Sequence, residues 1–82
     1  MMADYRVVRD SVRAEALVPK ARSPHEVLVN HLVDGQRATL SARGVHRRLG
    51  RLFLAASARG LVMRSTQIDD GDQTVWFEDP DP

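Results

Sequence analysis

The sequence predicts a single small domain of the α+β class that is mainly helical, with three helices followed by a C-terminal two-stranded hairpin. Apolar residues recur at helical spacing in two segments, 24–33 and 43–59. After Gly60 the pattern changes to strand-like alternation, in two short runs on either side of the turn sequence DDGD. A chain of 82 residues has room for one hydrophobic core, so we expect one folded unit.

Residues 1–22 are expected to form an amino-terminal extension, and their pattern fits two structures. The residues that would share one face of a helix, with Asp4 as its cap, are Tyr5, Val8, Val12 and Ala16. The residues that alternate as in a strand are Val12, Ala14, Ala16 and Val18. We favour the helix, and Pro19 would end either structure.

A helix is predicted over residues 24–33 because both its start and its end are marked. The sequence SPHE, beginning at Ser23, forms a capping box: a serine able to cap, a proline suited to the first helical position, and a glutamate three residues after the serine. Apolar side chains at helical spacing give this helix a buried stripe, and Asp34-Gly35 ends it.

The longest predicted helix runs from about Arg43 to Arg59 and has two distinct faces. Its apolar face consists of Val45, Leu49, Leu52, Phe53 and Ala56. Its basic face consists of Arg43, Arg47 and Arg51, which are spaced by four, with Arg48 beside them. Leu54 and Ala58 lie near the basic face, which indicates either a second buried side or a dimer contact, and we favour the buried side.

The residues after Gly60 predict a β-hairpin with DDGD as its turn. Trp76 is the expected buried anchor of this hairpin against the helices. The alternative is that Val75 and Phe77, on the opposite face of the strand, are the buried pair. Residues 80–82 are expected to be a flexible acidic tail.

The charged residues are segregated along the chain although the net charge is only +1. Residues 36–68 contain seven arginines and no acidic residue, whereas residues 69–82 contain six acidic residues and no basic one. An exposed helix normally mixes the two signs to gain pairs four residues apart, and the basic face here has only like charges. The segregation therefore indicates a negatively charged partner for the basic segment.

These elements resemble the winged helix-turn-helix family of DNA-binding domains over residues 23–79. The resemblance rests on the hairpin, on the sequence RGLV at its entry, and on the apolar positions counted back from Gly60, which are Leu49, Phe53 and Ala56. It implies a winged helix-like domain in which residues 43–59 are the recognition helix that enters the major groove and the hairpin is the wing. Residues 36–44 would then form only a short turn of helix, capped by Thr39 or Ser41.

The predicted function is DNA binding, in a small transcriptional regulator of the kind that phages and mobile elements encode. Double-stranded DNA is the expected partner, because arginine makes bidentate contacts with phosphates and with guanine. The expected DNA-binding residues are Arg37, Arg43, His46, Arg47, Arg48, Arg51 and Arg64. A homodimer is left open.

The alternative prediction is a protein-interaction module, an adaptor or inhibitor that docks through the acidic hairpin and tail, because Asp69, Asp70 and Asp72 lie at the expected tip. We expect no enzyme, metal or cofactor: the serines lack a nucleophile motif, there is no cysteine, and the histidines lack the short spacing of metal ligands. No segment reaches the length of a membrane span, and the first ten residues lack the apolar core of a signal peptide, so a cytoplasmic location is expected.

Overall fold

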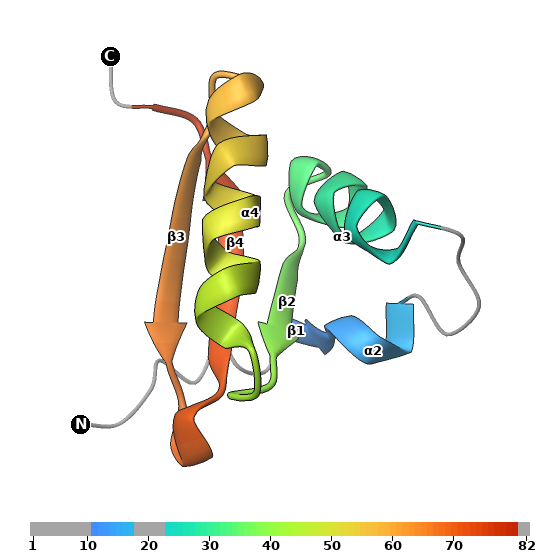
Figure 1. Cartoon of the computed structure of the whole chain (residues 1–82). Helices are drawn as coiled ribbons and strands as arrows, with labels where there is room; N and C mark the ends of the chain where they lie inside the picture. Colours follow the sequence, from blue (N-terminus) through green and yellow to red (C-terminus); the bar gives the residue numbers. More distant parts are fainter. Residues whose placement is uncertain (1–10, 18–22, 81–82) are drawn as a thin grey trace.

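The computed structural model of the protein describes residues 11–17 and 23–80 (Figure 1). This part of the chain contains three helices, four strands and one turn of 3-10 helix. In chain order they are β1 (Ser11–Arg13), α2 (Ala14–Leu17), α3 (Pro24–Val33), β2 (Arg37–Leu40), α4 (Val45–Ala58), β3 (Val62–Gln67), the 3-10 turn (Asp69–Gly71) and β4 (Gln73–Glu78).

The four strands form one mixed sheet in the order β1-β2-β4-β3. β3 and β4 form the predicted antiparallel hairpin, β2 pairs antiparallel with β4, and β1 pairs parallel with β2. The predicted mainly helical, winged helix-like fold with a two-stranded wing is therefore wrong: the protein has three helices and a four-stranded sheet. The sheet has two more strands than predicted because β2 pairs with the free edge of β4, and β1 pairs with β2.

The segment RATL, expected to lie in a turn of helix, is the strand β2. Its side chains Ala38 and Leu40 are fully buried, which a strand achieves by pointing alternate residues to one face. Thr39 points to the other face, where its hydroxyl bonds the Thr74 hydroxyl at 3.2 Å and also contacts the Ser11 hydroxyl. Thr39 therefore links three strands and caps no helix.

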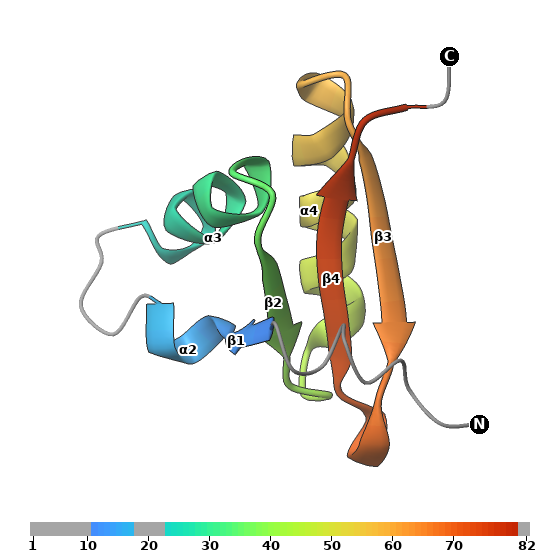
Figure 2. The same ribbon diagram turned by 180° about the vertical axis from the view of Figure 1, so that it is seen from behind.

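α3 and α4 pack on one face of the sheet and form the core with it. Figure 1 shows α4 in front of β3 and β4 with α3 beside it, and Figure 2 shows the strands in front when the molecule is seen from behind. The sheet contributes Ala38, Leu40, Val75 and Phe77 to this core, and the helices contribute Ala14, Leu28, Val29, Leu32, Val45, Leu52 and Ala56.

The hairpin buries the side of β4 opposite to the one expected. Val75 is fully buried and Phe77 is 7% exposed, so these two residues face the helices and the predicted anchor, Trp76, does not. Trp76 is half-buried on the other face of the sheet, where its indole Nε1 donates to Glu78 Oε2 at 2.7 Å. The Arg37 guanidinium lies over its ring at 5.3 Å. The alternative prediction for this strand is confirmed.

Of the amino-terminal extension, only residues 11–17 are described. The favoured helix is wrong for Ser11–Arg13, which pair with β2 as a strand, and the alternative strand is wrong for Ala14–Leu17, which form a helix. The change occurs at Ala14, which is fully buried in the core. The expected capping and ending residues, Asp4 and Pro19, lie outside the described residues.

The two longer helices lie where they were predicted. α3 begins at Pro24, although the Ser23 side chain makes no capping hydrogen bond, so the capping box does not form as expected. α4 begins after Gly44 and ends before Gly60, both of which adopt a φ of 71° that favours glycine. Phe53, assigned to the apolar face of this helix, is 55% exposed, and that assignment is wrong.

Candidate nucleic-acid interface

Three arginines form what we call the basic surface, on α4 and the turn before it: Arg43, Arg47 and Arg51. All three side chains are exposed, and none of them forms an ion pair with another residue of the described chain. They stay outside because Val45, Leu52 and Ala56 hold the opposite side of α4 against the core. The predicted separation of an apolar and a basic face is thus present in the folded protein.

Leu54 is exposed on the outer side of α4, close to the basic surface in helical position. It has an exposed fraction of 67%, the largest among the bulky apolar residues described. A second buried side of α4, which was the favoured interpretation of this residue, is therefore wrong. An apolar side chain among cationic ones can contact a sugar or a thymine methyl group while the arginines bind phosphate.

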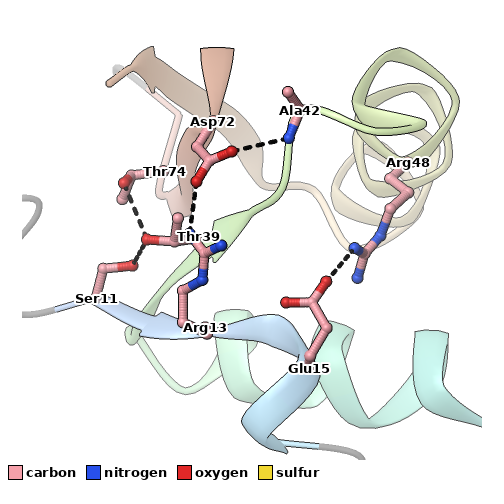
Figure 3. A network of polar contacts seen from close by, with 8 residues as sticks. All are labelled: Ser11, Arg13, Glu15, Thr39, Ala42, Arg48, Asp72 and Thr74. Atoms are coloured by element: carbon pink, nitrogen blue, oxygen red, sulfur yellow. Dashed lines mark hydrogen bonds and ion pairs between the residues drawn. The ribbon is translucent and has the colours of Figure 1, made fainter. Parts of the chain in front are cut away.

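Arg48 lies beside the basic surface but differs from it in having a partner. Its Nη1 donates to Glu15 Oε1 of α2 at 3.1 Å, as Figure 3 shows. The side chain is one-third exposed, so the pair lies at the edge of the core. Exposed pairs of this kind contribute at most about 1 kcal/mol to stability, and the pair's main effect is to orient the guanidinium.

A cleft separates the start of α3 from α4, and Arg48 and Arg51 line one side of it. It encloses about 310 Å³ and is lined by Pro24, His25, Leu28, Arg48, Arg51 and Leu52. Burial lowers the pKa of His25 below its ordinary value of 6.5, and the positive charges of Arg51, Arg59 and Arg48 lower it further. The part of this shift that comes from the arginine charges also favours an anion in the same place.

The remaining predicted site residues lie elsewhere. His46 is exposed on α4, seven residues before Phe53 and therefore on the side of the helix turned away from the cleft. Arg37 and Arg64 lie on the face of the sheet opposite to the helices, on either side of Trp76. Arg64 Nε pairs with Glu78 Oε1 at 3.4 Å. The structure thus places Arg47, Arg48 and Arg51 on α4 with Arg43 in the turn before it, and separates Arg37 and Arg64 from them.

One of the three aspartates in the acidic turn between β3 and β4 forms hydrogen bonds with other parts of the chain. Asp72 accepts a hydrogen bond from Arg13 Nη1 at 2.7 Å and another from the backbone N–H of Ala42 at 2.9 Å (Figure 3). The hydrogen bond from Arg13 and the one from Ala42 lower the pKa of this carboxyl below 3.8. Asp72 therefore ties the turn to β1 and to the loop before α4, while Asp69 and Asp70 are exposed.

Sequence reasoning missed both Asp72's structural contacts and the cleft. Arg13 and Asp72 are 59 residues apart, and no local pattern announces their pairing. His25 stood out in the sequence only as a metal ligand to be excluded. The sequence did show that His25 lies near the start of one helix and that arginines lie on the next. These residues line one cleft only because the two helices pack together.

Among residues 11–17 and 23–80 no group of three His, Cys, Asp or Glu side chains is placed to hold a metal ion. No helix in this same part of the chain has the length and apolar character needed to cross a membrane. Comparisons with protein-family models, with curated proteins and with solved structures found no match. The resemblance to winged helix-turn-helix domains therefore has no support from the fold or from relatives.

Proposed function

We propose that this protein binds nucleic acid, with double-stranded DNA as its partner, through the basic surface of Arg43, Arg47 and Arg51. The observation that carries the proposal is the exposure of these three guanidinium groups with no carboxylate partner in the part of the chain that the structure describes. Like charges four residues apart on a helix destabilise it slightly, and phosphate groups would remove that repulsion.

The position of the arginines along α4 gives a second reason. The first turn of α4 contains Arg47 and Arg48 and no acidic residue. The amino-terminal end of a helix carries a partial positive charge, so cations there cost stability and anions are favoured. A sequence that accepts this local cost at an exposed surface is best explained by an anionic partner.

The geometry suits contacts with a phosphate backbone. A helix rises 1.5 Å per residue, so Arg47 and Arg51 are separated by about 6 Å along the axis of α4. The planar guanidinium of each can bind two phosphate oxygens at once. Leu54 is exposed on the same outer side and can make an apolar contact with a thymine methyl group.

The proposal is tested by fluorescence anisotropy of a labelled duplex of random sequence, titrated with the protein over a series of salt concentrations. Each phosphate contact contributes about −0.9 to the slope of log K against log salt, so three contacts give about −2.7. Between 50 and 200 mM salt this slope corresponds to a loss of affinity of about 40-fold.

Replacement of Arg47 and Arg51 by alanine should make the slope shallower by about 1.8, because two phosphate contacts are lost. The double lysine variant should keep the slope, since it keeps the charge. The control is Arg64→Ala, which removes a single cation from the opposite face of the sheet and should leave binding unchanged. Wild-type affinity in a folded double alanine variant, or equal weakening by Arg64→Ala, would contradict the proposal.

A further inference from the structure

The cleft between α3 and α4 has features that simple contact with a phosphate backbone does not require. It encloses about 310 Å³, which lies at the lower end of the range for small-ligand pockets, about 300 to 1,000 Å³. Its floor is formed by Leu28 and Leu52, both of which belong to the core and hold the two helices in place. A double helix is far too wide to enter it.

The walls of the cleft present flat groups that also carry or favour positive charge. His25 contributes an imidazole ring from the first turn of α3, and Arg48 and Arg51 contribute guanidinium planes from α4. Unpaired bases stack on histidine rings and on arginine planes, whereas phosphates bind the guanidinium N–H groups. One cleft of this volume thus offers both stacking surfaces and cationic hydrogen-bond donors.

The side chains at the cleft are held in different ways. Glu15 pairs with Arg48 at 3.1 Å and fixes the orientation of this side chain. Arg51 forms no ion pair among the described residues and is exposed, so its guanidinium can move onto a ligand. Burial lowers the pKa of His25 and so favours the neutral ring, which stacks on a base without repelling the neighbouring arginines.

We propose that this cleft binds one unpaired nucleotide of the nucleic acid, with its base between His25 and the arginine side chains and its phosphate on Arg48 and Arg51. The inference rests on the proposed function and deepens it. A protein with such a cleft beside its basic surface would bind a duplex that carries a bulged or single-stranded nucleotide more tightly than a fully paired one.

The first test uses the wild-type protein and needs no variant. Adenosine monophosphate, adenosine and inorganic phosphate are titrated separately, and NMR follows the methyl groups of Leu28 and Leu52 and the ring of His25. Saturable shifts at these residues are expected with the mononucleotide at millimolar concentration, and weaker ones with either fragment. Absence of saturable shifts with adenosine monophosphate would overturn the proposal.

The second test compares three duplexes of equal length in the anisotropy assay: fully paired, with one extra unpaired nucleotide, and with an abasic residue at the same place. We expect the unpaired nucleotide to improve affinity by about tenfold through stacking, and the abasic residue to lose most of that gain. Equal affinity for the paired duplex and the bulged one would overturn the cleft proposal and leave the proposed function standing.

The matched variants are His25→Ala, which removes the stacking ring from the cleft, and Val27→Ala, which shortens a side chain of α3 that does not line the cleft. The first should lose the preference for the bulged duplex while keeping affinity for the paired one, and the second should keep both. Loss of the preference in both folded variants would contradict a role for the cleft. If adenosine monophosphate binds but no duplex does, both the proposed function and the binding of a nucleotide that is part of a nucleic acid are wrong.

Discussion

Leu52 and Phe53 are neighbours in the sequence, and from the structure we expect losses of stability of different size when each is replaced by alanine. Leu52 is fully buried on the side of α4 that faces the sheet, whereas Phe53 is 55% exposed on its flank. Successive residues of a helix point about 100° apart, so a single position decides between core and surface. Sequence periodicity had placed both residues on the apolar face.

The expected magnitudes differ by a factor of about three. Leucine-to-alanine changes in a core cost about 2 to 5 kcal/mol, because a cavity remains where the side chain was. A domain of 82 residues has a total stability of about 4 to 12 kcal/mol. We expect a loss of about 3 kcal/mol for Leu52→Ala, which lowers Tm by about 12 to 24 °C. Phe53→Ala removes a side chain that buries less than half its surface and should cost about 1 kcal/mol.

The assay is urea denaturation followed by Trp76 fluorescence and by circular dichroism, with the change in midpoint converted to free energy at constant m-value. Equal losses for the two variants, or a larger loss for Phe53→Ala, would refute the reasoning. Such a result would mean that α4 is rotated by about 100° on the sheet. Arg47 and Arg51 would then not both lie on the outer surface that we propose binds nucleic acid.

Three further predictions concern titratable groups. Because the folded pKa of Asp72 lies below 3.8, its contacts stabilise the protein above that pH and are lost as the pH falls through the folded value; the urea midpoints of wild type and Asp72→Asn should converge there. The hydrogen bond from Trp76 holds the pKa of Glu78 below 4.5, so tryptophan fluorescence should show a step below pH 4.5 that Glu78→Gln abolishes. Arg51→Ala should raise the pKa of His25 measured by NMR; an unchanged value would show that the charge of Arg51 does not contribute to lowering it.

The local elements of this fold could be read from the sequence because their signals are local. α3 occupies the predicted range 24–33, and the hairpin has its turn in the acidic sequence that was expected to form it. α4 ends before Gly60, because a residue with positive φ cannot continue the helix and glycine adopts that φ without strain. Proline, glycine and the helical repeat act within a few residues of their own position, so no knowledge of distant partners is needed.

The sheet could not be read in the same way, because its extra strands are short and their partners are distant. β1 has three residues and β2 has four, which is too few for a two-residue period to stand out. What stabilises them is pairing: β1 with β2, and β2 with β4 more than thirty residues later. The same pairing decides that Val75 rather than Trp76 faces the core.

For the candidate site, too, some features could be predicted from the sequence and others could not. The sequence by itself determined that the middle of the chain is rich in arginine and free of acids, since composition does not depend on folding. The spacing of Arg43, Arg47 and Arg51 also predicted a basic face. Only the tertiary structure decided that Arg48 pairs with an acid on α2 and that Arg64 lies on the far side of the sheet. The reason is that a charge acts over distances in space, and packing sets those distances.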